Sequence, residues 1–466
     1  MICQASQNIE TKAALVGFLE SGCKPVDRWR LGSEQEAFAY RRRDYRPLSF
    51  EGEQPSILGL LQAFTDHGWE PVTEAVNIIG LTRGAASISL EPGGQFEFAG
   101  APQDDVHHIF RETRAYLDEL LPLADRLGVS FLAMGHRPEP SDSPLPWMPK
   151  DRYRIMRAYM PTRGGSGHDM MQSTCSYQVT LDFASEADMV KKFRVALAVQ
   201  PLVTAMFANS PWVAGKPNGL VSNRDRVWQD TDPDRCGDLP FVFEAGMGFE
   251  RYVDYILDVP MYFVYRDGSY IDASGLSFRD FLAGRLSSLP GELPTLDDWT
   301  HHLTTVFPQV RMKQFLEMRG ADAGRPGERI PALAALWCGL LYDSQCLDAV
   351  WDRAKDWTAE ERAGLHHGVN RFGWHLEFRQ QPLIDECRWL VGLAEQGLQR
   401  RAILNTEGLD ESIYLQPLWA GLESGEMPAE QLLRRFAGCW PADSRQWADA
   451  AQRTEVLDQL SRETFA

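Results

Sequence analysis

Two acidic side chains in one short segment suit the binding of a cation. Residues 32–38 (GSEQEAF) read as a strand, and Glu34 and Glu36 stand two positions apart within it. Residues i and i+2 of a strand point to the same face of the sheet, so both carboxylates would share one face. Like charges at that distance repel each other, and each resists the loss of water. A divalent cation bound beside them would remove both objections.

A second segment, residues 87–98 (SISLEPGGQFEF), carries two more carboxylates. Polar and apolar residues alternate on both sides of the Pro-Gly-Gly break, and the two polar faces end in Glu91 and Glu97. Folding back at the glycines would bring these two carboxylates near each other. Four carboxylates with no interleaved lysine resemble the all-oxygen surroundings that Mg²⁺ or Mn²⁺ prefers. The alternative reading is a pair of solvated edge strands, and the residues alone leave it open.

Basic side chains occur in three clusters that suit phosphate chemistry. Phosphoryl transfer needs cationic groups as well as a metal ion. Each of these side chains, taken singly, also fits an ordinary surface position. The chain has no GxSxG and no HExxH motif, so the residues favour an enzyme that uses metal and phosphate over those hydrolase classes. The clusters consist of Arg152, Arg154 and Arg157, of Arg224, Arg226 and Arg235, and of Arg311, Lys313 and Arg319 around Glu317.

Strand patterns dominate the first part of the chain and helix patterns the last. Apolar residues at helical spacing predict a helix over 57–64, between strands over 34–40 and 87–98. From about residue 331 onward nearly every segment reads as helix. Strands early and helices late predict an α+β fold with a mostly antiparallel sheet. No long linker interrupts the chain, so we expect residues 1–466 to form one catalytic unit, with a sheet-rich core over about 25–330 and a helical part over about 331–466.

Composition narrows the class of protein further. The 466 residues carry a formal charge of −18, which argues against a general nucleic-acid binder. The longest apolar stretches, such as 333–341, are too short for a membrane-spanning helix. Eight cysteines without a CxxC pair favour reduced thiols in a cytoplasm. We therefore expect a cytoplasmic enzyme that acts on small molecules, without nucleic acid or membrane partners. Its oligomeric state, a monomer or a homodimer, is left open by the sequence.

Ordered motifs along the chain resemble a known family. Their order and length match the plant and proteobacterial class of glutamate–cysteine ligase, over about residues 12–440. The motifs are 30–36 (RLGSEQE), 88–97 (ISLEPGGQFE), 148–153 (MPKDRY), 207–211 (FANSP), 216–219 (KPNG), 228–232 (WQDTD), 252–255 (YVDY) and 316–322 (LEMRGAD).

The resemblance implies a fold and a reaction. The fold is glutamine-synthetase-like: helices surround a curved, mostly antiparallel sheet that forms a funnel-shaped active site with Mg²⁺ or Mn²⁺ at its base. ATP, as co-substrate, phosphorylates the γ-carboxylate of L-glutamate. The amino group of L-cysteine then attacks this γ-glutamyl phosphate. The products are γ-glutamylcysteine, ADP and phosphate, in the first step of glutathione biosynthesis.

The resemblance also assigns roles to individual residues. Arg224 matches an arginine suited to the glutamate carboxylate, and Arg152 is a further candidate for substrate charge. Because a thiol suits a soft, apolar pocket, Tyr153, Met156 and Tyr255 are expected to line the cysteine site. The implied metal ligands are Glu34, Glu36, Glu91, Glu97 and Glu317, and the implied catalytic residues are Glu36, Arg319 and Arg157.

Two other functions remain open at this point. Another carboxylate–amine (γ-glutamyl) ligase on the same scaffold would keep the phosphoryl transfer and change only the amine. A non-catalytic relative that binds glutamate or nucleotide would need no metal cluster. The matching region starts close to the first residue, leaving little room for a plastid transit peptide, so we expect a bacterial cytoplasmic protein.

Overall fold

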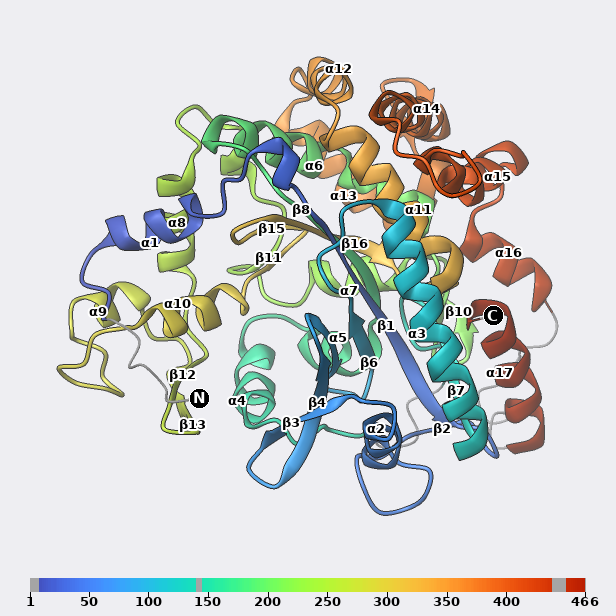
Figure 1. The fold of residues 1–466 in the computed structure, drawn as a ribbon, viewed down its shortest axis with the longest axis horizontal. Helices are drawn as coiled ribbons and strands as arrows, with labels where there is room; N and C mark the ends of the chain where they lie inside the picture. The colour runs from blue at the N-terminus through green and yellow to red at the C-terminus, as the bar shows by residue number, and fades with distance from the viewer. Residues whose placement is uncertain (1–7, 140–144, 438–449, 466) are drawn as a thin grey trace.

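The computed structural model describes residues 8–139, 145–437 and 450–465, and one large sheet runs through its centre (Figure 1). The sheet has ten strands. They are Leu31–Arg41 (β1), Arg46–Pro47 (β2), Glu70–Glu74 (β3), Asn77–Arg83 (β4), Ala86–Leu90 (β5), Phe96–Ala99 (β6), Val129–Leu132 (β7), Ser176–Leu181 (β8), Val310–Met312 (β15) and Leu316–Asp322 (β16).

Every pairing in this sheet is antiparallel. Eight strands follow the order β15-β16-β8-β1-β6-β5-β4-β3, and β2 and β7 pair with the second half of β1. The expected α+β class with a mostly antiparallel sheet is therefore confirmed. Four two-stranded ribbons lie outside the sheet: Trp212–Val213 (β9) with Lys216–Pro217 (β10), Cys236–Gly237 (β11) with Phe307–Pro308 (β14), Phe263–Arg266 (β12) with Ser269–Asp272 (β13), and Glu377–Phe378 (β17) with Gln381–Pro382 (β18).

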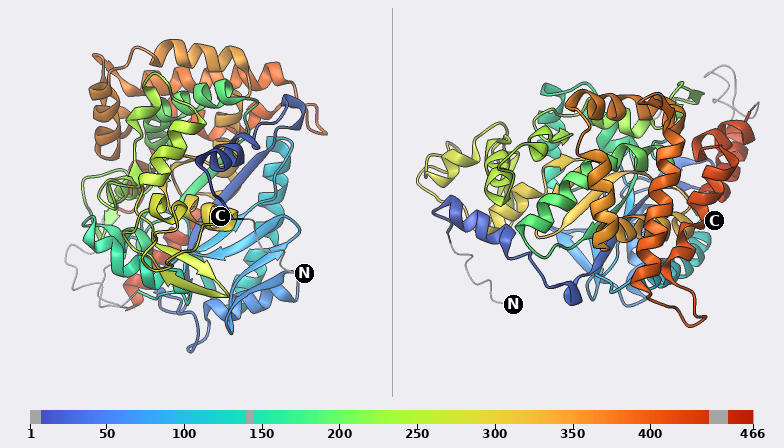
Figure 2. Two further views of the ribbon diagram at one scale, coloured as in Figure 1. Left: turned by 90° about the vertical axis from the view of Figure 1, so that its left-hand side faces the viewer. Right: turned by 90° about the horizontal axis from the view of Figure 1, so that it is seen from above.

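Helices surround the sheet and make up most of the C-terminal part, drawn in orange and red in Figures 1 and 2. The helical C-terminal part was expected from the sequence and is confirmed. The helices are Lys12–Glu20 (α1), Ile57–Thr65 (α2), Val106–Leu127 (α3), Asp151–Tyr159 (α4), Gly167–Ser173 (α5), Glu186–Phe207 (α6), Asn223–Gln229 (α7), Phe249–Asp258 (α8), Phe278–Leu282 (α9), Leu296–Leu303 (α10), Pro326–Leu341 (α11), Ser344–Ala354 (α12), Ala359–Phe372 (α13), Leu383–Arg401 (α14), Gln416–Ser424 (α15), Pro428–Arg435 (α16) and Ala450–Phe465 (α17).

The segment that was predicted to fold back at its glycines does so. β5 and β6 pair as an antiparallel hairpin, and the amide of Glu91 donates to the carbonyl of Gln95 at 2.9 Å to close the turn. Gly94 has a φ of +83°, which favours glycine. A Cβ at Gly93 would lie 2.6 Å from the carbonyl oxygen of Gln172, so there is no room for a side chain there.

One face of the sheet is buried against helices. α3 and α11 pack on β1, and α11 also packs on β8. Paired residues share a face, so Tyr177 lies beside Gln35, and its hydroxyl donates to the carbonyl of Gly324, next to α11. Glu34 pairs with Gln178 and points the opposite way. The helices therefore take the apolar face, and the polar face of β1 and β8 is left for a site.

The described residues share one hydrophobic core. It extends from Ile9 through the sheet and nearly all of α11 to Phe465 in the last helix. The described cysteines are free thiols, whereas Cys3 and Cys439 lie outside the described residues.

Within the described ranges, no single helix is long and apolar enough to cross a membrane. One bent pair, α11 with α12, reaches the required length and composition only when its two helices are taken together.

Candidate active site

The strand register brings the predicted carboxylates together. Glu36 of β1 lies directly opposite Glu97 of β6, and Glu97 in turn lies opposite Ser89 of β5. Glu34, two residues before Glu36, shares the same face of the sheet. This face points away from α11. Segments about sixty residues apart in the chain therefore build one acidic surface.

These side chains line a cavity of about 380 Å³. Its walls come from the strands β1, β5, β6, β8, β14, β15 and β16 and from the helices α4, α5 and α7. β1, β6, α5 and α7 lie near the centre of Figure 1. Three predicted site residues, Arg157, Tyr255 and Glu317, do not line it. The predicted residues that line it are Glu34, Glu36, Glu91, Glu97, Arg152, Tyr153, Met156, Arg224 and Arg319.

Three carboxylates of the cavity have raised pKa values. Burial raises the pKa of Glu36 to about 7, and the nearby charge of Glu91 adds to the shift. Burial and the charges of Glu34, Glu91 and Glu36 raise the pKa of Glu97 well above its usual value. The pKa of Glu34 is raised by burial and by Glu317. A positive charge bound among these groups would lower their pKa values and stabilise the ionised forms.

Hydrogen bonds from β8 hold the Glu36 carboxylate in place. The amide of Ser176 donates to one oxygen at 2.7 Å. The Ser176 hydroxyl at 3.1 Å and the Gln178 amide at 3.3 Å donate to the other. Neither Ser176 nor Gln178 is among the predicted site residues, although residues 176–181 (SYQVTL) alternate polar and apolar side chains as the two glutamate segments do.

Two arginines of the cavity carry no counter-ion. Arg224, near the start of α7, is buried, and its Nη2 donates to the carbonyl of Arg319 at 2.7 Å. The Nε atoms of Arg224 and Arg152 are both buried without a hydrogen-bond partner. Within the described residues, neither guanidinium group forms an ion pair. Unpaired guanidinium groups in a cavity suit an anionic substrate, because a planar fork can bind a carboxylate or phosphate with two hydrogen bonds.

Glu317 has the opposite surroundings. Arg311 Nε lies 2.5 Å from one of its oxygens, Arg319 Nη1 lies 3.0 Å from the same oxygen, and Lys313 Nζ lies 3.3 Å from the other. Burial would raise its pKa, but these three cations hold it well below the usual value. Glu317 is thus a counter-ion with both oxygens engaged. This arrangement differs from the metal-ligand role that was expected for it.

Two further predicted residues point elsewhere. Arg157 is exposed, and its guanidinium lies 4.4 Å from the ring centre of Trp147, outside the cavity. Tyr255 packs against the ring of Phe241, with ring centres 5.2 Å apart. Their positions outside the cavity lining argue against direct contact with a substrate there.

The segment before and within α4 contributes an unpredicted lysine. Lys150 Nζ donates to the carbonyl of Leu90 at 2.8 Å, and the Tyr153 hydroxyl donates to the same oxygen at 2.7 Å. Burial lowers the pKa of Lys150, against the charges of Glu91 and Glu97. Lys150 is therefore a cation that lies close to the acidic surface. Its place next to Arg152 in the chain is the signal that could have marked it.

The acidic residues fit a divalent cation by their chemistry. Glu34, Glu36, Glu91 and Glu97 supply only oxygen donors, the kind that Mg²⁺ prefers, and burial raises the pKa values of Glu34, Glu36 and Glu97. No group of three or more His, Cys, Asp or Glu side chains in residues 8–139, 145–437 and 450–465 is gathered closely enough to hold an ion. The carboxylates are spread around the cavity wall.

Comparison with known proteins assigns the chain to a family. The profile of glutamate–cysteine ligase family 2 matches residues 30–462. The chloroplastic glutamate–cysteine ligase of Medicago truncatula is 49% identical over 430 residues, which cover 92% of this chain and 83% of the relative. The chloroplastic enzyme of Arabidopsis thaliana is 48% identical, over 92% of this chain and 80% of its own.

These relatives contradict one expectation. The chain was expected to be a bacterial cytoplasmic protein, but the similar proteins from Medicago, Arabidopsis and rice are chloroplastic by name. These relatives contradict the cytoplasmic assignment. The distance from the first residue to the matching region is therefore no guide to location.

A solved structure supports the fold. The glutamate–cysteine ligase of Francisella tularensis, in complex with AMP, superposes with a TM-score of 0.53 at 12% identity, covering 95% of this chain and 93% of its own. This likeness supports the expected glutamine-synthetase-like architecture. The family profile and relatives near half identity over 92% of the chain carry the classification: the chain belongs to glutamate–cysteine ligase family 2.

Proposed function

We propose that the protein uses ATP to join the γ-carboxylate of L-glutamate to the amino group of L-cysteine. The relatives at 48–49% identity bear the name of that ligase. One structural observation carries the proposal further. A single cavity combines four carboxylates with two guanidinium groups that form no ion pair within the described residues. A reaction between a metal-bound nucleotide and an amino acid with two carboxylates needs both kinds of group.

The proposed reaction has two steps. A carboxylate is a poor acyl donor because its oxygen is a poor leaving group. Transfer of the γ-phosphoryl group of ATP to the glutamate γ-carboxylate forms γ-glutamyl phosphate and ADP. The cysteine amine then attacks the acyl carbon, the bond to the phosphate oxygen breaks, and the amine loses a proton. The products are γ-glutamylcysteine, ADP and phosphate.

Four glutamates are the residues that would hold the metal cofactor, Mg²⁺ or Mn²⁺: Glu34, Glu36, Glu91 and Glu97. When bound, the cation supplies charge neutralisation for the ATP phosphates. Among the four, we assign the main role to Glu36, because Ser176 and Gln178 orient both of its oxygens.

The basic residues bind and orient the substrates. Arg224, buried and without a carboxylate partner, binds a carboxylate of glutamate through its guanidinium fork. Arg152 supplies charge for a phosphate or a second substrate carboxylate. Arg319 faces the cavity and is positioned by Glu317 and Gln178, so Glu317 acts through it.

The cysteine side chain requires an apolar surface. Tyr153 and Met156 line the cavity from one face of α4 and provide that surface. Arg157 and Tyr255 lie outside the cavity lining and receive no role in this proposal.

We also propose that residues 1–466 act as one catalytic unit. The cavity lies in the sheet-rich part over about 25–330, and the helical part over about 331–466 supports the opposite face of the sheet. A monomer and a homodimer are the two proposed states of the chain. Sedimentation of the purified chain distinguishes them.

The test is ADP release with ATP and Mg²⁺, measured with glutamate alone, with cysteine alone and with both. We expect turnover only with both substrates. Glu36→Gln should lower turnover by about 10²–10³-fold, because it removes one charge of the metal-binding group. Glu70→Gln, at an exposed position of β3 in the same sheet, is the matched control and should retain full activity.

Other outcomes point to the alternatives. If glutamate alone supports turnover and cysteine adds nothing, the phosphoryl transfer holds and the amine is wrong, and a panel of amines then identifies the acceptor. If no combination releases ADP, the chain is a binder of glutamate or nucleotide.

A further inference from the structure

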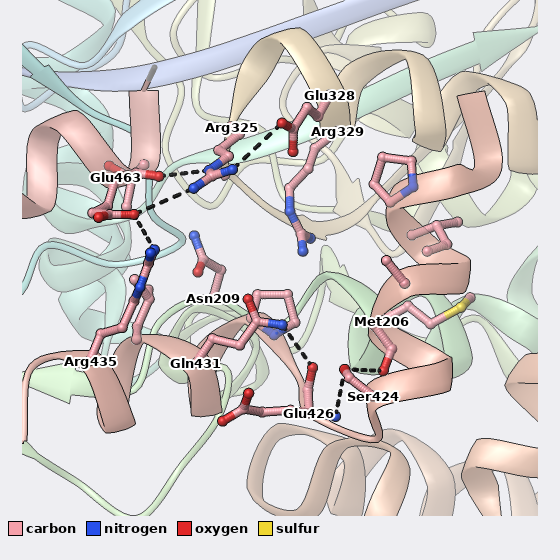
Figure 3. Close-up of a pocket in the computed structure, with 18 of the residues that line it drawn as sticks. Met206, Asn209, Arg325, Glu328, Arg329, Ser424, Glu426, Gln431, Arg435 and Glu463 are labelled. Carbon is pink, nitrogen blue, oxygen red and sulfur yellow. Dashed lines mark hydrogen bonds and ion pairs between the residues drawn. The ribbon is translucent and has the colours of Figure 1, made fainter. Parts of the chain in front are cut away.

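A second cavity, of about 390 Å³, lies among the C-terminal helices (Figure 3). Its walls come from the end of α6, the first turn of α11, the helices α15 and α16, and the end of α17. It shares no lining residue with the candidate active site. The two cavities are therefore separate.

Charged residues of both signs line this cavity, and most of them neutralise each other. Four arginines face three glutamates. Each glutamate forms an ion pair with at least one arginine, as the dashed lines in Figure 3 show for those around α17. The pairs are Arg325 with Glu328 at 3.5 Å and with Glu463 at 3.4 Å, Arg434 with Glu426 at 2.6 Å, and Arg435 with Glu463.

Arg329 is the arginine that has no counter-ion. In the described part of the chain it forms no ion pair, and its Nη1 atom is buried without a hydrogen-bond partner. Figure 3 shows its guanidinium pointing into the open middle of the cavity, with no dashed line to a neighbour. Burial lowers its pKa to about 10, although the charges of Glu328 and Asp322 act in the opposite direction. Such a charge is costly unless a partner binds it.

The remaining walls suit an organic molecule. Met206, Trp374 and Leu418 give the cavity apolar surface on the side of α6 and α15. The first turn of α11, which carries Arg329, adds the positive end of a helix dipole. The volume is within the range of small-molecule sites, which are mostly apolar with a few placed polar groups.

We propose that this cavity binds a small organic anion, whose carboxylate or phosphate group pairs with Arg329 and whose apolar body packs against Trp374 and Leu418. The site is separate from the substrates of the ligase reaction. Neither the size of the cavity nor its charge requires a nucleotide.

Calorimetric titration of the full chain tests the proposal with three probes. Phenyl phosphate and benzoate share an apolar body and differ in the anionic group, whereas inorganic phosphate has no body. We expect one of the two aromatic anions to bind more tightly than inorganic phosphate, and this identifies the group that Arg329 prefers. Arg329→Gln should weaken that binding at least about tenfold, because a hydrogen-bonded charge pair is lost. Arg434→Gln, which alters an arginine already paired with Glu426, should change it less than about threefold.

Two more variants make the test decisive. Arg224→Gln removes an unpaired guanidinium from the other cavity and should leave the probe affinity unchanged. Ala420→Trp adds a large side chain at an exposed position of the cavity lining and should abolish binding, which decides the matter if Arg329→Gln fails to fold. Binding that is lost in Arg224→Gln but kept in Arg329→Gln and Ala420→Trp would overturn the proposal. So would the absence of binding for all three probes at about 10 mM.

Discussion

Glu97 and Glu317 lie on the same face of one antiparallel sheet and have opposite ionisation behaviour. The register connects them through β1 and β8, because Glu97 pairs with Glu36 and Thr180 pairs with Glu317. Burial acts to raise both pKa values. The pKa of Glu97 is nevertheless raised, whereas that of Glu317 is held low.

The neighbouring charges explain the difference. Three cations lie within 3.3 Å of Glu317. Positive charge therefore neutralises the carboxylate at this end of the sheet. At the other end the carboxylates face one another, and the charge of Lys150 is shared among them. Residue type and burial therefore do not decide what a glutamate does here. A carboxylate that lacks a protein cation is the one able to bind an external cation.

The largest expected effect separates the two glutamates by stability. Glu317→Gln leaves Arg311, Lys313 and Arg319 without their shared counter-ion in a buried place, and should lower the free energy of unfolding by about 3–5 kcal/mol. Glu97→Gln removes a repelled carboxylate and should change it by less than about 1 kcal/mol. Urea unfolding without divalent cations measures both. Equal losses of unfolding free energy in the two variants would contradict the difference between Glu317 and Glu97.

The pH dependence of stability is a second test of the difference between the two ends of the sheet. Burial raises the pKa of Glu36 from 4.5 to about 7, so the folded protein holds a proton that the unfolded chain releases between these values. The contribution of this group is fully present below pH 4.5 and is lost as the pH rises through about 7, on the order of 3 kcal/mol. Urea unfolding at pH 5 and pH 8, without divalent cations, should show this loss in the wild type and not in Glu36→Gln. Parallel pH profiles would refute the assignment.

A divalent cation should act on the acidic end of the sheet alone. At about one hundred times its dissociation constant, Mg²⁺ should raise the free energy of unfolding by about 2.7 kcal/mol at pH 8, because it binds the folded state. Glu36→Gln should lose most of this stabilisation, and the exposed control Glu70→Gln should keep it. The response is read from thermal unfolding with and without chelator. A full response in Glu36→Gln would mean that the cation binds elsewhere.

The smallest expected effect concerns the unpaired arginines. Arg224→Lys keeps the charge and loses the fork, so the KM for glutamate should rise about tenfold with a smaller change in kcat. Arg226→Lys, on the exposed side of the same helix, is the control and should leave both constants near the wild-type values. Steady-state kinetics at saturating ATP and cysteine measure them. A similar change in both variants would show that Arg224 acts through the helix and not on the substrate.

Local patterns predicted the elements that carry the acidic site. Alternation in residues 31–41 and 86–99 is a property of strands, and the Pro-Gly-Gly turn permits only a tight reversal, so β1, β5 and β6 could be recognised. The same alternation in residues 176–181 was present but carried no acid to mark it. The polar partners of Glu36 were therefore missed.

Position along a helix separated residues that were predicted together. Arg152, Tyr153 and Met156 of α4 line the cavity, whereas Arg157, nearer the end of the same helix, is exposed and lies against Trp147. A cluster of arginines in sequence thus divides between a cavity and the surface. The spacing alone could not say which side would be buried.

The amino-acid sequence by itself determined the strands, the reversal at the glycines, the helical C-terminal part and the resemblance that named the acidic residues. Only the tertiary structure decided which carboxylates meet, that Glu317 is neutralised by three cations, and that Arg224 and Arg329 form no ion pair within the described residues. The physical reason is that secondary structure follows from neighbours in the chain, whereas ionisation depends on charges and burial contributed by distant segments. Those segments come together only when the strands pair in register.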